Sequence, residues 1–341
     1  MRSVPSRLPA LPVQPADVPW PTHAWPRGAA SPALEAAALP LWDAPEEVGS
    51  TLALLVVQGG RVVYERYAAG LDASSTLPSW SMAKSITHAL CGLLLADGQL
   101  DLDVPLRPRE WLGKGDVRAG ITLRHLLAMR SGLEFVEDYV DSGISDVMEM
   151  LWGSGKDDVA GYAAMKPALH APDTHFNYSS GSTNIVARHL GEIVGGGAAG
   201  MAQFMRARLF DAIGITSANP KFDGHGTFKG SSFCFCTAQD FARFGLLYLR
   251  DGLWDGRRVL PAGWVDTART VVSSDPTKAH EHYGLHWWIN DGGETFAARG
   301  YEGQRIVVAP GKDAVVVRLG RSSLEEGPRM HERVLGVVGV L

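Results

Sequence analysis

Cysteine is scarce in this chain of 341 residues, and the sequence contains no long apolar run. The three cysteines, Cys91, Cys234 and Cys236, are an odd number and too few for a disulfide framework, which favours a reducing compartment. No segment approaches the roughly 20 apolar residues that span a bilayer, and residues 1–26 lack the apolar core of a secretory signal peptide. We therefore expect a cytoplasmic protein with no membrane partner.

Charge is also low and nearly balanced. The 32 Lys and Arg residues oppose 37 Asp and Glu residues, which gives a formal net charge of −5. Nucleic-acid binding needs a basic excess on one face, and none is visible, so we expect no nucleic-acid partner. A hydrophobic content of 45% is enough for a large core, and the length fits one large domain or two interleaved ones.

Strand patterns lie toward both ends of the chain, and helical patterns dominate the middle. Two β-rich runs flank Gly59-Gly60 and predict a hairpin, and further strand-like runs occupy 285–289, 295–298, 305–308 and 314–319. Helical spacing occupies 81–96, 123–129, 144–152, 184–194, 201–210, 238–250 and 328–338.

These patterns predict an α/β (α+β) fold, with an antiparallel β-sheet flanked by helices and an inserted all-α domain. Residues 31–100 and 241–341 are expected to form the α/β body, and residues 101–240 the helical domain. Residues 1–30 are rich in proline, which predicts an N-terminal arm that is either extended on the surface or disordered.

The sharpest motif is Ser81-Met82-Ala83-Lys84, at the start of the first long helical pattern. Residues at i and i+3 share one face of a helix, so the Lys84 amine can approach the Ser81 hydroxyl. A serine becomes a nucleophile when a base takes its proton, and a lysine held out of water can be that base. The alternative is a capping serine followed by a solvated lysine.

A second polar segment runs from Phe176 to Asn184. Tyr178 can accept or relay a proton beside an ammonium group, and the Ser180 hydroxyl can hold the site by hydrogen bonding. The alternative is a cluster of helix caps, in which serine and asparagine are common.

A third segment, 298–304, leads into the predicted strand at 305–308. A glycine such as Gly300 on an edge strand lets a substrate approach the backbone closely. The main-chain N–H of Tyr301 can then complete an oxyanion hole with the N–H of Ser81. Without the other motifs, this segment is only a bulge-prone entrance to a strand.

In this order, the three motifs resemble the serine β-lactamase and penicillin-recognising enzyme superfamily, over about residues 45–340. The likeness is greatest to its class C-like branch, which includes esterases, D-aminopeptidases and 6-aminohexanoate-dimer hydrolases. It implies an active site in the cleft between the body and the helical domain. Residues 137–141 look like the stretch that contributes an active-site tyrosine in the 6-aminohexanoate-dimer hydrolases, so we expect Tyr139 to contact the substrate.

In the mechanism that this resemblance implies, Lys84 and Tyr178 together take the Ser81 proton, and Ser81 attacks an ester or amide carbonyl. The N–H groups of Ser81 and Tyr301 stabilise the oxyanion, and Tyr178 returns a proton to the leaving group. Water then hydrolyses the acyl-enzyme, so we expect no metal or organic cofactor.

Two departures from the family pattern narrow the expected substrates. Ser180 stands where the family usually has asparagine. The third motif lacks the lysine that binds the carboxylate of penicillin-type substrates, and Arg299 replaces it only in part, if it points inward. We therefore expect a serine hydrolase of esters or small amides rather than an efficient β-lactamase. The departures also leave a second hypothesis open, a protein of this fold that binds or senses ligands without turnover.

Several other patterns are given less weight. His280, His282 and His286 have no carboxylate or cysteine partner that we can place, so we expect no metal site. The G-x-S-x-G motif of α/β-hydrolases is absent.

An acidic group and the tryptophan content complete the sequence-based expectations. Glu137, Asp138 and Asp141 are typical of a solvated turn, with a place in the cleft as the alternative. Low charge and ten tryptophans favour an apolar cleft suited to uncharged acyl groups.

Overall fold

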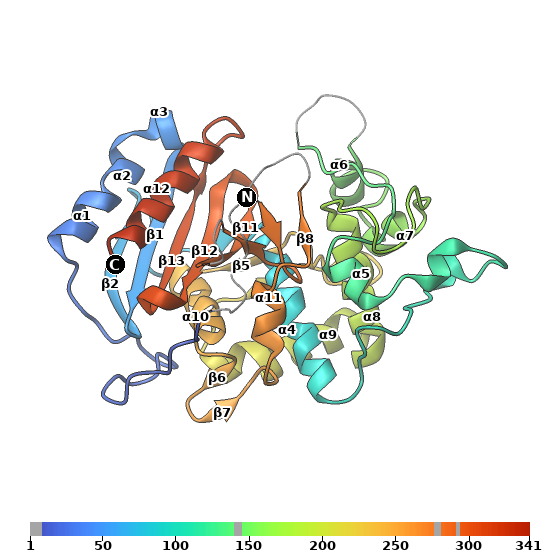
Figure 1. Ribbon diagram of the computed structural model, residues 1–341, viewed down its shortest axis with the longest axis horizontal. Helices are drawn as coiled ribbons and strands as arrows, with labels where there is room; N and C mark the ends of the chain where they lie inside the picture. Colours follow the sequence, from blue (N-terminus) through green and yellow to red (C-terminus); the bar gives the residue numbers. More distant parts are fainter. Residues whose placement is uncertain (1–8, 140–144, 276–280, 291–293) are drawn as a thin grey trace.

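One antiparallel sheet forms the body of the molecule (Figure 1). The computed structural model describes residues 9–139, 145–275, 281–290 and 294–341. In spatial order, the strands of this sheet are β2 (Arg61–Tyr67), β1 (Ser50–Gln58), β13 (Ala314–Arg321), β12 (Gln304–Ala309), β11 (Phe296–Gly300), β10 (Trp288–Ile289), β9 (His282–Tyr283) and β8 (Ser273–Ser274). A smaller sheet contains β3 (Leu77–Pro78), β5 (Cys234–Cys236) and β4 (Asn219–Pro220), and β6 (Leu253–Trp254) pairs with β7 (Arg257–Arg258).

Apolar side chains cover both faces of the large sheet. Leu54 and Val56 of β1 belong to one core, together with residues of α1 (Pro32–Ala38) and α12 (Gly327–Gly339). Leu55 and Val57 belong to the other core, with residues of α4 (Met82–Ala96) and α10 (Ala238–Leu249). Because successive side chains of a strand point to opposite faces, β1 has to be apolar at nearly every position.

The other helices surround these layers, and those of the middle of the chain lie beyond α4 (Figure 1). They are α2 (Pro40–Asp43), α3 (Pro45–Val48), α5 (Leu123–Leu127), α6 (Asp146–Leu151), α7 (Val159–Ala164), α8 (Ser180–Val194), α9 (Gly197–Met205) and α11 (Trp264–Arg269). α4 contacts β11 and β12 of the sheet as well as α8, so it lies between the sheet and the helices of the middle segment. Among the described residues, no helix is both long and apolar enough to cross a bilayer.

The fold class is confirmed, whereas several elements differ from their predicted extent. The hairpin and the strands near the C-terminus are present. The strand expected at 285–289 contains only Trp288 and Ile289, and α8 begins at Ser180 rather than at residue 184. The proposed boundaries at residues 100 and 240 stay predictions.

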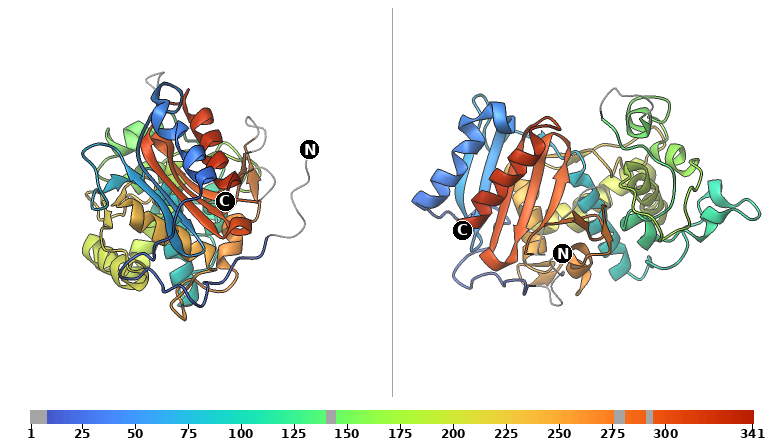
Figure 2. Two further views of the ribbon diagram at one scale, coloured as in Figure 1. Left: turned by 90° about the vertical axis from the view of Figure 1, so that its left-hand side faces the viewer. Right: turned by 45° about the horizontal axis from the view of Figure 1, so that its top comes forward.

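Residues 9–28 run along the body with turns at 16–18 and 21–24 and no helix or long strand (Figure 2). Buried side chains of the body hold the backbone of this N-terminal arm: Arg243 Nε donates to the Pro21 carbonyl at 2.7 Å, and Arg250 Nη1 donates to that of Pro12 at 3.2 Å. The indole of Trp254 also donates to Thr22 Oγ1 at 2.9 Å.

Candidate active site

Ser81 and Lys84 lie together at the N-terminal end of α4. Lys84 Nζ donates to Ser81 Oγ at 2.9 Å, and the lysine is only 1% exposed. The Ser81 side chain makes no capping hydrogen bond to α4. A capping serine with a solvated lysine, the alternative left open by the sequence, is therefore wrong for this pair.

The turn before Ser81 is held in a left-handed conformation by Trp80, whose φ is 43°. This region is costly for residues other than glycine and is enriched at functional sites. Trp80 Nε1 donates to Glu302 Oε2 at 3.0 Å, and the indole meets the Tyr301 ring edge to face, with 5.6 Å between centroids. These contacts fix the turn that presents Ser81.

Strand β11 reaches the same turn through Gly300. A Cβ on Gly300 would lie 2.4 Å from the Ser79 carbonyl oxygen, so only glycine permits this approach. The predicted edge strand is internal, between β12 and β10. However, its ladder with β10 ends at Ala297, whereas its ladder with β12 continues to Gly300. Residues 298–300 therefore extend beyond β10, beside the Ser81 turn.

The start of α8 contains both a helix cap and a site residue. Ser179 Oγ accepts from Ser182 N at 3.0 Å and caps the helix. Ser180 Oγ instead accepts from Lys84 Nζ at 2.9 Å. Ser179 therefore caps the helix, whereas the next residue, Ser180, contacts Lys84.

Tyr178 contacts Lys84 through its ring rather than through its hydroxyl. Lys84 Nζ lies 4.7 Å from the centroid of the Tyr178 ring, which is a cation–π distance. In the part of the chain that the structure describes, no hydrogen bond joins the Tyr178 hydroxyl to Lys84 or Ser81.

Glu137 lies in the site, although the sequence analysis favoured a solvated turn for it. Its Oε2 accepts from Ser180 N at 2.7 Å, and its Oε1 accepts from Ser180 Oγ at 2.5 Å and from the Tyr139 hydroxyl at 2.9 Å. Burial and this carboxylate raise the pKa of Tyr139 well above its usual value, so Tyr139 remains a donor. The Tyr139 ring stacks on Tyr301 at 4.5 Å between centroids.

The position of Tyr139 in the sequence also indicates a place for Glu137 in the site. Residues i and i+2 of an extended segment share one face, so placing Tyr139 in the site also places Glu137 there. Of the other two acidic residues in this group, Asp138 adjoins Glu137, and Asp141 lies outside the described residues.

Arg299 of the third motif lines the pocket but is held by its neighbours. Its Nη1 donates to Glu281 Oε1 at 3.0 Å, and its Nη2 donates to Asn290 Oδ1 at 2.6 Å. On the adjacent strand, burial and the nearby guanidinium groups of Arg299 and Arg318 lower the pKa of Arg305 to about 9. Arg305 is not among the residues that the sequence motifs indicate.

Many of these residues line one pocket of about 640 Å³, whereas Lys84 and Ser180 lie behind its walls. Its walls include Ser81, Glu137, Tyr139, His175, Phe176, Asn177, Tyr178, Asp275, Glu281, Trp288, Arg299, Gly300, Tyr301, Arg305 and Leu324. The cleft has aromatic walls, but it is not apolar throughout, because acidic and basic side chains share these walls. Trp288 is the only tryptophan among these lining residues.

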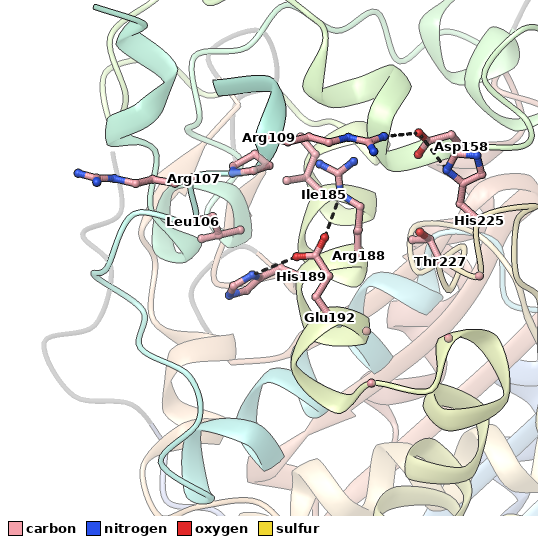
Figure 3. Close-up of a pocket in the computed structure, with 15 residues that line it drawn as sticks. Leu106, Arg107, Arg109, Asp158, Ile185, Arg188, His189, Glu192, His225 and Thr227 are labelled. Carbon is pink, nitrogen blue, oxygen red and sulfur yellow. Dashed lines mark hydrogen bonds and ion pairs between the residues drawn. The ribbon is translucent and has the colours of Figure 1, made fainter. Parts of the chain in front are cut away.

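A second pocket, of about 470 Å³, lies over α8 and contains none of the predicted site residues (Figure 3). Most of its charged groups pair with one another: Arg109 and His225 both face Asp158, at 3.5 and 3.3 Å. Arg188 Nε lies 3.9 Å from Glu192 Oε1. Arg107 also lines the pocket, but it points away from these paired groups (Figure 3).

His282 and His286 have local hydrogen-bond partners. His282 Nδ1 bonds with Ser274 Oγ at 2.8 Å, and the buried His286 bonds with Thr183 Oγ1 at 3.0 Å. His280 lies outside the described residues, and within those residues no group of three or more His, Cys, Asp or Glu could hold a metal ion. The cysteines are buried thiols.

Known proteins are similar to this chain in sequence and in fold. A curated relative, the 6-aminohexanoate-dimer hydrolase of Paenarthrobacter ureafaciens, is 28% identical over 306 residues, which cover 84% of this chain and 77% of the relative. A solved structure from Bacillus anthracis, provisionally named a 6-aminohexanoate-dimer hydrolase, has a TM-score of 0.78 at 22% identity, over 97% of this chain and 91% of that one.

A family VIII carboxylesterase has a TM-score of 0.68 at 12% identity, over 92% of this chain and 99% of that one. At such identities, the two solved structures show a shared fold. The Beta-lactamase family model matches residues 46–337. Because this match spans most of the sequence, the chain belongs to the beta-lactamase family.

Proposed function

We propose that this protein hydrolyses esters or small amides through an acyl-enzyme formed on Ser81. The observation that carries the proposal is the buried pair of Lys84 Nζ and Ser81 Oγ, 2.9 Å apart, beside a pocket that Ser81 lines. A general base must lie within hydrogen-bond reach of the proton that it removes, and Lys84 meets this condition. The curated relative, named a hydrolase of an amide dimer, supports the same class of reaction.

Lys84 is the immediate base in this proposal, and Tyr178 is the acid for the leaving group. Lys84 contacts the Ser81 hydroxyl directly, whereas Tyr178 offers its ring to Lys84 and lines the pocket. This assignment differs from the joint base that the sequence suggested.

The oxyanion donors are the N–H groups of Ser81 and Tyr301. Both residues line the pocket, and Gly300 brings β11 against the turn that precedes Ser81. Donors fixed before the reaction stabilise the charge that develops on the carbonyl oxygen without reorganisation.

The pocket walls support small substrates with polar ends. Glu281, Arg299 and Arg305 lie among the aromatic rings that line it, with Arg299 already paired to Glu281, so the walls offer polar as well as apolar contacts. The Tyr139 ring stacks on Tyr301 and lines the pocket, which supports a contact of Tyr139 with the substrate. Ser180 Oγ accepts a hydrogen bond from Lys84.

A substrate panel with Ser81→Ala tests this function. We expect the wild-type protein to turn over short p-nitrophenyl esters or linear amides many times, and Ser81→Ala to lose about 10⁴-fold or more of that rate. A variant that keeps the full rate would contradict the proposal. An acyl-enzyme that accumulates on the wild type without turnover would instead support the ligand-binding hypothesis.

A further inference from the structure

Three hydrogen-bond acceptors surround Lys84 Nζ, one for each N–H of an ammonium group. Its Nζ donates to Ser81 Oγ, to Ser180 Oγ and to the Ser231 carbonyl oxygen, at 2.9, 2.9 and 3.2 Å. An ammonium group has three donors and no lone pair, so in this state Lys84 cannot accept the Ser81 proton. One proton has to leave Lys84 before Ser81 can be activated.

Glu137 is the carboxylate that faces Lys84 within the described residues. Its Oε1 lies 4.0 Å from Lys84 Nζ, and the Ser180 hydroxyl bridges the two groups. Ser180 Oγ accepts from Lys84 at 2.9 Å and donates to Glu137 Oε1 at 2.5 Å. The bond from Ser180 N to Glu137 Oε2 holds the carboxylate in line with this hydroxyl.

We propose that Glu137 takes a proton from Lys84 through the Ser180 hydroxyl and so prepares Lys84 as the base for Ser81. Lys84 Nζ gives one proton to Ser180 Oγ as Ser180 gives its own proton to Glu137 Oε1. The products are a neutral amine, an unchanged serine and a neutral carboxylic acid. Rotation about the Cε–Nζ bond then turns the lone pair of Lys84 toward Ser81. Glu137 is thus a positioning residue that acts through Ser180.

Burial makes an ion pair of Lys84 and Glu137 costly to keep. The side chains of Lys84 and Glu137 are 2% and 9% exposed, so neither charge is well hydrated, and a proton transfer removes both charges at once. Glu137 also lines the substrate pocket. A bound substrate displaces water from it, which makes the ion pair still less favourable. The transfer is therefore promoted when a substrate is present.

Glu137→Gln tests the inference, which rests on the proposed function. Glutamine keeps the shape of the side chain and can accept from Ser180 N, but it cannot take up a proton. We expect the acylation rate of a p-nitrophenyl ester to fall by about 10²-fold with little change in KM, as for the loss of one acid or base group. Glu137→Asp, which restores a carboxylate, should recover part of that rate.

A counterion role predicts the opposite result. If Glu137 only kept Lys84 charged, Glu137→Gln would ease the loss of the lysine proton, and acylation would stay at or above the wild-type rate. If Glu137 only ordered Tyr139 and Ser180, KM would rise and the maximal rate would remain. Either outcome, or equal rates for Glu137→Gln and Glu137→Asp, overturns the inference.

Two further variants complete the test. Ser180→Ala removes the bridge without touching the carboxylate, and the double variant with Glu137→Gln should be no slower than either single one. Glu134→Gln, in the same segment but outside the pocket lining, is the matched control and should keep the wild-type rate. A wild-type protein with no turnover and no label on Ser81 would overturn the proposed function itself, which separates the two failures.

Discussion

At the scale of single residues, the site consists of polar side chains that burial forces into one arrangement. Lys84 is nearly inaccessible to solvent, and each of its donors has an acceptor in the structure. Unpaired buried polar groups cost free energy, so this set of bonds fixes the lysine amine beside Ser81. A lysine on a solvent-exposed surface would sample many conformations and would contact Ser81 only transiently.

Tyr178→Phe separates the acid and base roles of Tyr178. A p-nitrophenolate leaving group needs no proton, whereas an amine leaving group does. We expect Tyr178→Phe to keep the ester rate within about threefold and to slow amide hydrolysis by about 10²-fold. Steady-state kinetics with matched esters and amides measure the split. Equal losses on both substrates would mean that Tyr178 also acts on the Ser81 proton.

Ser81 and Lys84 could be predicted because their contact is local, within one helical turn. The bonds between Glu137 and Ser180 join residues that are 43 positions apart in the chain. A spacing rule for helices says nothing about such a pair, and the acidic residues beside Glu137 favoured a solvated turn. The contact of this carboxylate with Ser180 and Lys84 depends on the tertiary fold. The expected place of Tyr139 in the site is the sequence signal that indicates Glu137.

At the scale of elements, the site depends on the contact between β11 and the turn before α4. Gly300→Ala tests this contact, because the added Cβ would lie 2.4 Å from the Ser79 carbonyl oxygen and 3.1 Å from Trp80 Cβ. The turn and the strand must then separate, and a shift of about 1 Å in a catalytic geometry costs on the order of 10²-fold in rate. We expect that loss in kcat/KM.

Gly311→Ala is the control for this substitution. A Cβ on Gly311, in the turn between β12 and β13, meets no heavy atom within 4 Å. It should therefore leave kcat/KM unchanged. If Gly300→Ala behaved like Gly311→Ala, the close approach of β11 would be irrelevant to catalysis.

The elements that the sequence missed have physical explanations. α1, α2 and α3 each begin with a proline, Pro32, Pro40 and Pro45, which suits the first turn of a helix but obscures short helical patterns. In the run at 285–289, Leu285 N donates to Thr267 O, and His286 N donates to Leu127 O. These residues therefore leave the sheet ladder despite their apolar sequence.

At the scale of the whole molecule, two buried histidines make the stability of the fold depend on pH. Burial lowers the pKa of His88 well below its usual value, and burial together with Lys84 lowers that of His286 to about 3. His88 bonds with the Tyr248 hydroxyl at 2.7 Å, and His286 with the Leu127 carbonyl at 2.9 Å. Both rings are therefore neutral in the folded protein at moderately acidic pH.

The stability of the fold should fall in mild acid. In the unfolded chain, His286 titrates near 6.5, and in the folded protein near 3. Its contribution is complete above pH 6.5 and is lost as the pH falls toward 3, at about 1.4 kcal/mol per pH unit. Urea unfolding between pH 7 and about 5, where most carboxylates stay ionised, should show a decreasing free energy of unfolding.

His286→Asn provides the comparison for this dependence. The variant should be less stable at pH 7, since a buried ring is lost, but its free energy of unfolding should depend less steeply on pH. Equal slopes for the wild type and the variant would show that His286 is not the neutral buried group described above.

Each end of the chain contributes to the same body. The large sheet joins residues 50–67 with residues 273–321. The side chains of Arg243 and Arg250, at α10, hold the N-terminal arm against the body. The strand patterns near both ends of the sequence predicted that these ends share one α/β body. The path of the arm could not be predicted, because it depends on buried arginines more than 200 positions away.

The most direct test of the account is the mass of the protein during turnover. Wild-type protein mixed with a p-nitrophenyl ester and quenched in acid should carry one acyl group, which peptide mapping should place on Ser81. Ser81→Ala should carry none, whereas the control Gly311→Ala should be acylated like the wild type. An acyl group on another residue, or turnover by the wild type with no acylated species at any quench time, would contradict the central claim.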